Sequence, residues 1–218
     1  MRLDHSTTAT LTALARQLNA RHRGARTLPA LLLLSDDVRL PDPLSAAWAL
    51  SRHSAIVLRH YQAVDKARLA RRLARACHSR GLVLLIAGDP ALAARVHADG
   101  LHLGEARLAQ VRRWRQQRPD WLITVSAHTL PALINAQRAG ADAALLAPVF
   151  ATASHPGARP IGPVRFAALV HKSPLPVIAL GGIDAITARR LKESGAAGLA
   201  AIGALKATGG RPASVSPD

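Results

Sequence analysis

Two patterns of hydrophobic and polar positions alternate along the chain from residue 28 onward. Short runs of almost wholly apolar residues predict strands that are buried on both faces, as in a parallel sheet. Between these runs, apolar residues recur every three or four positions, which predicts amphipathic helices. The predicted strands are 30–36, 55–61, 82–88, 100–104, 121–128, 143–150, 176–182 and 198–203. The predicted helices are 43–52, 65–79, 90–98, 106–117, 130–139, 163–171 and 184–194.

This alternation of strands and helices favours an α/β fold built from βαβ units. Eight predicted strands suit a single-domain (β/α)8 TIM barrel, which we predict over residues 28–206. The alternative is an open, doubly wound sheet, in which a glycine-rich fingerprint should follow the first strand. The segment LLLLSDDVRLPDP at that place contains no glycine, so the barrel is favoured.

The two ends of the chain differ in composition from the barrel segment. Residues 1–27 are rich in Arg, Thr and Ala and poor in acidic residues, which fits a transit peptide or an amphipathic helix. The segment TTATLTALARQLNAR has helical spacing with Thr7 or Thr8 as a cap, so we predict an N-terminal helical extension over 1–27. Residues 207–218 are rich in Gly, Pro and Ser, which predicts a disordered tail.

The composition bounds the compartment and the partners. The 218 residues are 49% hydrophobic, enough for one sizeable core. The single cysteine, Cys77, allows no intrachain disulfide framework and no cysteine metal cluster, and we interpret it as a small filler on a helix. A reducing compartment, and hence a cytoplasmic location, is expected. The apolar run LPALLLL is too short to span a bilayer, so no membrane partner is expected.

The formal net charge of +16, from 29 Lys and Arg against 13 Asp and Glu, favours anionic partners such as phosphates or nucleic acid. Most basic residues lie in segments such as KARLARRLARACHSR and RLAQVRRWRQQR, where Arg recurs on polar helix faces. We interpret these as solvated faces, with a polyanion-binding surface as the alternative. Because the chain has no nucleic-acid motif and no stacking set of aromatics, no specific nucleic-acid partner is predicted.

Chemistry is expected at the C-terminal ends of the strands, where TIM barrels build their active sites. The last two strands end in ALGGIDA and AAIGAL. Their glycines, Gly181, Gly182 and Gly203, let backbone N–H groups approach an anion, and the loops after strands seven and eight often hold phosphate. A phosphate site is therefore predicted here, and the alternative is that the glycines only permit tight turns.

Other strand ends carry polar side chains. His128, in VSAH, is a candidate general acid or base. Arg59 is either an anion ligand or the partner of a salt bridge with Asp36. His102 is predicted to be structural. No metal site is predicted, because the acidic residues near the strand ends are scattered: Asp36, Asp37, Asp89 and Glu105.

The segment LLAPVFATASHPGARPIG (145–162) passes from an apolar strand into a polar loop. Such a loop is either an ordinary solvated connection or the rim of a site for an anionic ligand. Together with DGLHLG, VSAHTL, PVFAT and PVIALGGI, this segment resembles the thiamine-phosphate synthase/TenI superfamily, and the likeness extends over 29–205.

The resemblance implies a (β/α)8 barrel that acts in thiamine biosynthesis and binds a thiazole phosphate. It allows two activities. Thiamine-phosphate synthase joins a pyrimidine pyrophosphate to thiazole phosphate with Mg²⁺, whereas TenI is a metal-independent tautomerase that aromatises a thiazole phosphate carboxylate.

The positions that the resemblance assigns to Mg²⁺ lack carboxylates. Ala87 and Gly88 stand where the synthase has Asn-Asp, and Arg107 stands where it has its second metal carboxylate. This loss removes a metal worth several kcal/mol to the departure of pyrophosphate. Asp89 and Glu105 lie nearby and are candidates to replace the lost carboxylates, although neither is at the expected position.

The positions that the resemblance assigns to pyrophosphate are also altered. Arg59 is kept, but Tyr61 and His155 stand where the synthase has lysines. The TenI-like interpretation loses less, because Gly88 resembles the glycine of TenI and His128 stands at its proton-transfer histidine.

The resemblance further implies that the sixth loop closes over the substrate, so that Thr152, Ser154 and His155 face it. His155 is then a second acid–base group or a weak anion contact. We therefore predict a thiazole tautomerase that needs no metal or other cofactor, with Mg²⁺ required only by a synthase. The predicted catalytic residues are His128 and His155, and the predicted substrate and phosphate ligands are Arg59, Ser126, Thr152, Ser154, Gly181, Gly182 and Gly203.

Two alternatives stay open. The first is a synthase with a rebuilt Mg²⁺ site, and the second is a non-catalytic protein that binds a phosphate ligand. The sequence leaves the oligomeric state open, a homo-oligomer included.

Overall fold

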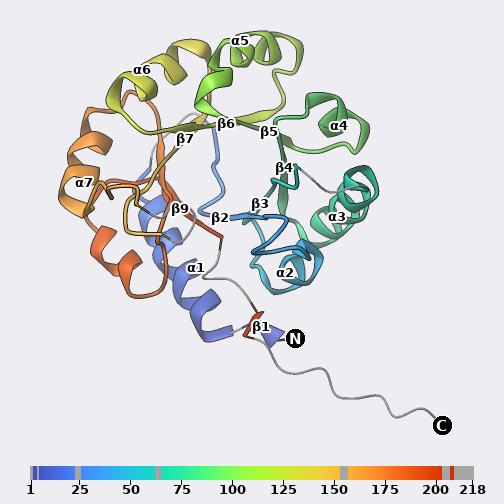
Figure 1. Cartoon of the computed structure of the whole chain (residues 1–218), viewed down its shortest axis with the longest axis horizontal. Coiled ribbons are helices and arrows are strands. Elements are labelled where there is room, and N and C mark those ends of the chain that lie inside the picture. The colour runs from blue at the N-terminus through green and yellow to red at the C-terminus, as the bar shows by residue number, and fades with distance from the viewer. Residues whose placement is uncertain are drawn as a thin grey trace.

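The computed structural model describes residues 2–3, 5–22, 26–61, 65–152, 157–202 and 207–208. Within these residues, eight parallel strands close into a barrel in sequence order, and the last strand pairs with the first. Helices form a ring around the barrel (Figure 1). The predicted (β/α)8 fold is confirmed, and each predicted strand contains one barrel strand.

The barrel strands are short and close to the predicted positions. They are β2 (Leu31–Leu34), β3 (Ala55–Leu58), β4 (Val83–Ala87), β5 (Gly100–Leu103), β6 (Leu122–Ala127), β7 (Ala143–Leu146), β8 (Val177–Ala179) and β9 (Gly198–Ala201). The outer helices are α2 (Pro43–Ala49), α3 (Lys66–Arg80), α4 (Pro90–Arg95), α5 (Leu108–Gln117), α6 (Leu130–Ala139) and α7 (Pro163–Lys172), with the 3₁₀ helices η1 (Glu105–Arg107) and η2 (Thr187–Leu191). The helices predicted over 43–52 and 90–98 end earlier than expected.

The strands are apolar on both faces because successive side chains enter two different cores. Leu32 and Leu34 of β2 belong to a cluster inside the barrel, together with Val57 of β3. Leu31 and Leu33 belong to the larger cluster between the barrel and the helices. This double burial explains why the sequence shows continuous apolar runs rather than alternation.

Several helices begin at a side-chain cap. Because each of these helices follows a loop at the C-terminal end of the barrel, the cap also sets where that loop ends. Asp42, Asp65, Asp89 and Thr129 each accept a hydrogen bond from a backbone N–H in the first turn of α2, α3, α4 and α6, respectively. Such bonds satisfy donors that a helix start leaves free. The carboxylate of Asp89 is therefore engaged in holding α4.

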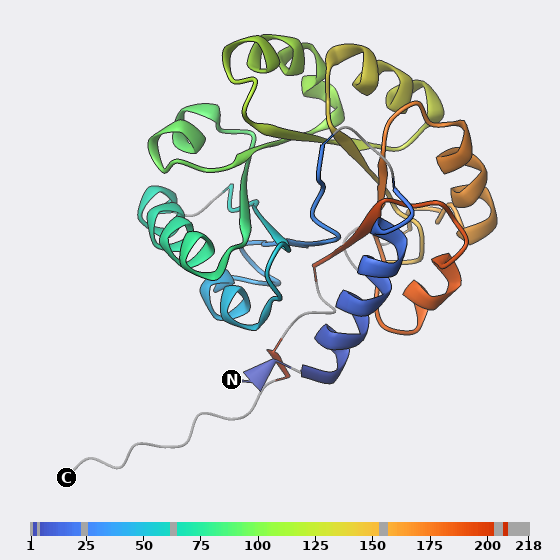
Figure 2. The ribbon, with the colours of Figure 1, turned by 180° about the vertical axis from the view of Figure 1, so that it is seen from behind.

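The N-terminal extension forms helix α1 (His5–Asn19), as predicted. Its end is bound to the barrel, because Asn19 Nδ2 donates to the carbonyls of Leu28 at 3.3 Å and Ala197 at 2.7 Å. These carbonyls lie just before β2 and β9, at the N-terminal end of the barrel. Figure 2 shows α1 at the edge of the barrel beside β2 and β9, and its buried residues Leu11, Leu14 and Leu18 belong to the cluster between the barrel and the helices, so the extension joins the outer ring.

The predicted cap of this helix is wrong, because α1 begins at His5, before Thr7 and Thr8. Thr8 is a buried residue of the helix, and its carbonyl accepts a hydrogen bond from the Thr12 hydroxyl. The two ends of the chain meet where β1 (Arg2–Leu3) pairs antiparallel with β10 (Ala207–Thr208). The predicted tail therefore begins with a strand, whereas 209–218 lie outside the described residues and their disorder stays a prediction.

The helix predicted over 184–194 is wrong, because only η2 follows β8. Asp184 accepts a hydrogen bond from the backbone N of Thr187 at 2.7 Å, and the Thr187 hydroxyl donates to the carbonyl of Gly182 at 2.8 Å. Local side-chain bonds of this kind compete with the start of an α-helix. The segment therefore forms a short turn held against the glycines at the end of β8.

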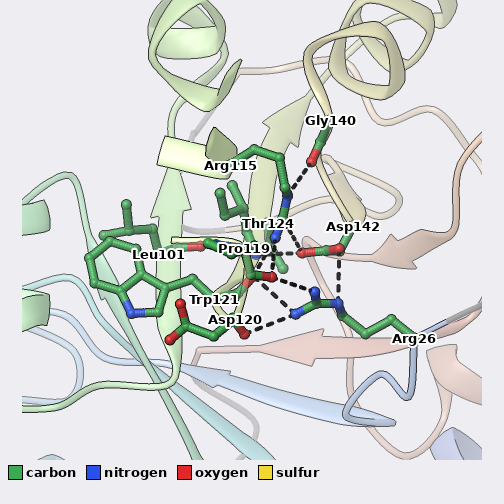
Figure 3. Close-up of polar contacts among 10 residues, drawn as sticks. Arg26, Leu101, Arg115, Pro119, Asp120, Trp121, Thr124, Gly140 and Asp142 are labelled. Atoms are coloured by element: carbon green, nitrogen blue, oxygen red, sulfur yellow. Dashed lines mark hydrogen bonds and ion pairs between the residues drawn. The ribbon is translucent and has the colours of Figure 1, made fainter. Parts of the chain in front are cut away.

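Arg26 and Arg115 tie together the N-terminal ends of β6 and β7 (Figure 3). Arg26 donates to the carbonyls of Pro119 and Asp120 at 2.8 and 3.0 Å. Both guanidinium groups bind Asp142, at 3.3 Å from Arg26 and 2.5 Å from Arg115. These contacts stabilise the end of the barrel that faces away from the site.

Two predictions from the composition concern the role of Cys77 and membrane-spanning segments. Cys77 is fully buried in α3, and burial raises the pKa of its thiol to about 12, so its interpretation as a filler residue is confirmed. Among the helices that the structure describes, none is long and apolar enough to cross a membrane.

Candidate functional site

A cavity of about 820 Å³ opens at the C-terminal ends of the barrel strands. The loops after β2, β3, β6, β7 and β8 contribute to its wall, in the region where TIM barrels build active sites. The predicted site residues that line it are Arg59, His128, Thr152, Gly181 and Gly182. The sequence prediction did not include other lining residues, among them Arg39, Phe150, Asp184, Thr187 and Arg190.

Positive charge dominates the wall of the cavity. Arg39, Arg59 and Arg190 line it together with His128, whereas Asp184 is the acidic lining residue. Arg190 also lies over the ring of Phe150, with 5.3 Å from the guanidinium carbon to the ring centroid. A low-dielectric pocket with this balance attracts anions.

Arg59 forms a salt bridge with Asp36, which is one of the two roles that the sequence allowed for it, the other being an anion ligand. Its Nη2 lies 3.1 Å from Asp36 Oδ2, and Arg39 Nη2 lies 2.6 Å from the same oxygen. Hydrogen bonding from Arg39 holds the pKa of the Asp36 carboxyl well below its usual range, so it stays ionised. The Nε of Arg59 is buried and lacks a hydrogen-bond partner among the described residues. Asp36 thus fixes the position of Arg59 at the wall of the cavity.

His128 forms a hydrogen bond with Glu105 at the rim of the cavity. Its Nδ1 lies 2.7 Å from Glu105 Oε2. Glu105 comes from η1, after β5, and His128 follows β6, so two neighbouring strand ends bring them together. The His128 side chain is 57% exposed. A carboxylate bound to Nδ1 orients the imidazole and leaves Nε2 as the basic nitrogen of the neutral ring.

His102 is a structural residue, as predicted. It is 4% exposed, and its two ring nitrogens lie 3.0 Å from the Thr124 hydroxyl and 3.1 Å from the Ser126 hydroxyl. Burial lowers the pKa of His102 to about 4, so the ring is neutral at neutral pH. Ser126, a predicted substrate ligand, does not line the cavity and is engaged with His102 instead.

The turn at Gly181 and Gly182 lies directly at the cavity. Both residues have positive φ, 94° and 64°, and a Cβ on Gly182 would lie 2.4 Å from the carbonyl oxygen of Ala151. Backbone conformation and close packing therefore require glycine here, as expected if these glycines only permit a tight turn. Among the described residues, none accepts a hydrogen bond from the backbone N–H groups of Gly181, Gly182 or Ile183. The turn therefore has donors for an anion, but η2 is too short to supply a helix dipole.

The loop after β7 is described on both sides of its centre. Thr152 lines the cavity, and the loop returns to the barrel where the N–H of Ile161 donates to the carbonyl of Pro148. The peptide bond between Ala147 and Pro148 is cis. Three predicted site residues lie outside the described residues, so their roles stay predictions: Ser154, His155 and Gly203.

The positions that the family resemblance assigns to Mg²⁺ do not fit that ion. Arg107 Nη1 donates to the carbonyl of Gly88 at 2.8 Å, so the two positions face each other with a cation at one of them. A Cβ on Gly88 would lie 3.1 Å from the same nitrogen. The nearby carboxylates are engaged elsewhere, Asp89 in capping α4 and Glu105 in binding His128. No group of three His, Cys, Asp or Glu able to hold a metal occurs among the described residues.

The site residues that sequence reasoning missed have weak local signals. Arg39 follows Asp36 by three residues in a loop, and Arg190 is one of many arginines on polar segments. In the sequence, Glu105 is one of several scattered acidic residues and a candidate to replace a lost metal carboxylate, but nothing there links it to His128. Pairing between neighbouring parallel strands brings it to His128, and that pairing is visible only in the fold.

Comparison with known proteins gives consistent results at the sequence level. A family model described as thiamine monophosphate synthase matches residues 31–205. The chain is 35% identical over 147 residues to thiamine-phosphate synthase of Geobacillus kaustophilus, covering 65% of this chain and 64% of that protein. It is 38% identical over 113 residues to putative thiamine-phosphate synthase 2 of Aquifex aeolicus, covering 51% and 59%. The chain spans less than two thirds of the length of these curated relatives.

Solved structures show the same architecture. The thiamine phosphate pyrophosphorylase of Pyrococcus furiosus superposes with a TM-score of 0.65 at 23% identity, covering 79% of this chain and 84% of that one. The native KDPGal structure superposes with a TM-score of 0.64 at 17% identity, covering 87% and 90%. At such low identity these likenesses establish the fold alone.

Proposed function

The chain belongs to the thiamine monophosphate synthase family, and we propose that within it this protein is a metal-independent isomerase that moves a proton on a thiazole phosphate. The observation that carries the proposal is the pair of His128 and Glu105 at the rim of a cationic cavity. A histidine held by a carboxylate is suited to proton transfer near neutral pH.

The isomerisation needs one group that first accepts and then donates a proton. In the neutral ring, His128 donates its Nδ1–H to Glu105, and the lone pair on Nε2 removes a proton from one carbon of the thiazole ring. The Glu105 carboxylate stabilises the imidazolium that forms. Nε2 then returns the proton to a second ring carbon, so substrate and product have the same atoms and charge.

The phosphate of the substrate has suitable partners among the other lining residues of the cavity. Arg59 and Arg190 supply positive charge, and the turn at Gly181 and Gly182 supplies backbone N–H groups. Thr187 holds this turn in place through its hydrogen bond to the carbonyl of Gly182. Preorganised donors of this kind bind an anion without reorganisation.

Metal independence is supported by the contact between Arg107 and Gly88. The guanidinium group is a fixed cation at the place where the family resemblance expects carboxylates around Mg²⁺. No step of the proposed reaction uses a metal ion, because base, acid and phosphate ligands are all protein groups.

A second candidate is a thiamine-phosphate synthase, the transferase for which the curated relatives are named. This activity would have to join a pyrimidine pyrophosphate to a thiazole phosphate with a magnesium site built from other residues. It has less support than the isomerase, because the cation Arg107 faces Gly88 where this activity would need metal-binding carboxylates.

The proposal is tested by following conversion of a thiazole phosphate tautomer, by ultraviolet absorbance and chromatography, with and without a metal chelator. The wild type should turn over equally in both. His128→Asn should lower kcat by about 10²- to 10⁴-fold, the usual contribution of a general acid–base. Affinity for the thiazole phosphate should stay nearly unchanged, because the phosphate contacts are intact.

His171→Asn is the matched control, because His171 is an exposed histidine on α7, and it should leave kcat unchanged. Formation of thiamine phosphate from both synthase substrates with Mg²⁺, at rates above the isomerisation, would overturn the proposal in favour of the transferase. Binding of thiazole phosphate with neither reaction would establish a non-catalytic binding protein.

A further inference from the structure

Helix α3 presents an unusually basic outer face. Its sequence, KARLARRLARACHSR, contains five arginines and one lysine and no acidic residue. Arg68, Arg71, Arg72 and Arg75 are exposed, whereas Leu73 and Cys77 on the other face are buried against the barrel. The helix lies on the outer ring next to α2 (Figure 1).

The arrangement of these arginines is unfavourable for the helix itself. Arg68 and Arg72, like Arg71 and Arg75, are four residues apart, where like charges repel and destabilise a helix. Among the residues that the structure describes, this face forms one ion pair, between Arg68 and the capping residue Asp65 at 3.9 Å, and both side chains are largely exposed. Among the described residues, nothing binds the guanidinium groups of Arg71, Arg72 and Arg75. An external anion would relieve this repulsion.

An exposed aromatic side chain lies beside Arg80, the last residue of α3. Trp48 of α2 is 60% exposed, and the guanidinium carbon of Arg80 lies 5.6 Å from the centroid of its ring. Arg80 also donates to the carbonyl of Trp48 at 3.1 Å, which fixes the two residues relative to each other. An indole beside a guanidinium group is a surface on which a nucleobase stacks.

We infer that the outer face of α2 and α3 binds single-stranded nucleic acid, with Arg68, Arg71, Arg72 and Arg75 on the phosphates and Trp48 under a base. The four arginines span about 10 Å along the axis of α3, and Arg80 beside Trp48 lies about 8 Å further on, so together they follow a strand of a few nucleotides. Arginine suits this role because its planar guanidinium group binds phosphate through two hydrogen bonds.

A membrane surface is the other polyanion that a basic helix can bind, and the burial pattern argues against it. A helix that lies in a membrane interface inserts its apolar face between the lipids. In α3 that face is occupied by the barrel, since Ala70, Leu73 and Cys77 are completely buried. The net charge of +16 adds long-range attraction for a nucleic acid, and the arginines of α3 concentrate positive charge on one face of the molecule.

The test measures binding of a fluorescein-labelled oligouridylate of about 20 nucleotides by fluorescence anisotropy, at KCl concentrations from about 50 to about 200 mM. The double variant Arg71→Glu/Arg75→Glu should weaken binding about tenfold and reduce the slope of log K against log[KCl] by about 1.4, as expected for two lost phosphate contacts. Trp48→Ala should weaken binding by about fivefold or more.

Arg112→Glu/Arg138→Glu is the matched control, because it makes the same change in net charge at exposed arginines of α5 and α6. It should keep most of the affinity. Equal losses in both double variants would overturn the inference, because they would show attraction by net charge alone. So would failure of the wild type to bind the oligonucleotide, or binding only to phosphatidylserine vesicles. Thermal unfolding of each variant, followed by circular dichroism, confirms that the variants are folded.

Discussion

His102 and His128 come from neighbouring strands, and their surroundings give them opposite properties. His102 is enclosed in the barrel with hydroxyl partners on both nitrogens, and its burial keeps it neutral. His128 lies at the rim, largely exposed, with a carboxylate on Nδ1. A neutral ring without solvent access stabilises the core, whereas an exposed ring with an oriented nitrogen is available to a substrate. The difference between them is one of position in the barrel.

The depressed pKa of His102 predicts a loss of stability in mild acid. The unfolded chain binds a proton at this residue below its ordinary pKa of 6.5, whereas the folded protein does so only near pH 4. The free energy of unfolding should therefore fall as pH decreases from 6.5 to 4, by about 3 kcal/mol, and level off below. Urea denaturation across this pH range measures the change.

The measurement is best made in a His22→Asn background, because burial also lowers the pKa of His22. The low pKa of the Asp36 carboxyl affects stability only in stronger acid, below the range tested. In the variant His102→Gln the fall between pH 6.5 and 4 should disappear. A wild type that is equally stable at both ends of this range would contradict the assignment.

Among the elements, the connection after β8 and the helix α1 show how local contacts replace regular structure or anchor it. Thr187 and Asp184 close a turn on Gly182, and this turn, not a helix start, presents the backbone donors to the cavity. At the other end, Asn19 joins α1 to the carbonyls before β2 and β9, where the barrel closes. The contact of Thr187 with Gly182 shapes the wall of the cavity, whereas the contacts of Asn19 stabilise the barrel.

Removing the anchor of α1 should therefore cost stability without affecting the site. The change Asn19→Ala leaves two carbonyl oxygens without their donor and should lower the free energy of unfolding by about 1–3 kcal/mol. Gln17→Ala, an exposed position on the same helix, is the control and should have almost no effect. Urea denaturation measures both. A loss of thiazole phosphate affinity in Asn19→Ala would show that the two ends of the barrel are coupled, contrary to this separation.

The whole molecule divides its tasks between two ends of one barrel. The N-terminal end carries the anchor of α1 and the contacts of Arg26 and Arg115 with Asp142, which hold strands together. The C-terminal end carries the cationic cavity, which Arg39, Arg59 and Arg190 line. Stability and binding are thus placed apart, a common arrangement in TIM barrels.

A ligand in the cavity should stabilise the entire fold. Thiazole phosphate at about 100 times its Kd should raise the free energy of unfolding by about 2.7 kcal/mol, because it binds only the folded barrel. At the same concentration Arg59→Ala should be stabilised much less, because its Kd is higher. Arg112→Ala, on the exposed face of α5, should behave like the wild type. Equal stabilisation of the Arg59 variant would place the anion elsewhere on the molecule.

Much of the architecture could be predicted from the sequence because burial on both faces leaves a local pattern. Each run such as LLLLS or VLLIA contains a barrel strand, and the predicted helix over 130–139 matches α6 at both ends. The helix over 184–194 failed because Asp184 and Thr187 form side-chain bonds that periodicity does not show. The cap of α1 failed because threonine at a favoured capping position also packs well inside a helix.

Part of the candidate site could be predicted from the same hydrophobic pattern of the strands. Strand ends could be located from the pattern, so Arg59, His128 and Gly181 were correctly placed at the mouth of the barrel. The sequence by itself determined the barrel and the strand ends at which Arg59, His128 and Gly181 lie, because these follow from short-range periodicity. Only the tertiary structure decided that Glu105 binds His128 and that Arg107 faces Gly88, because parallel pairing joins residues that are far apart along the chain.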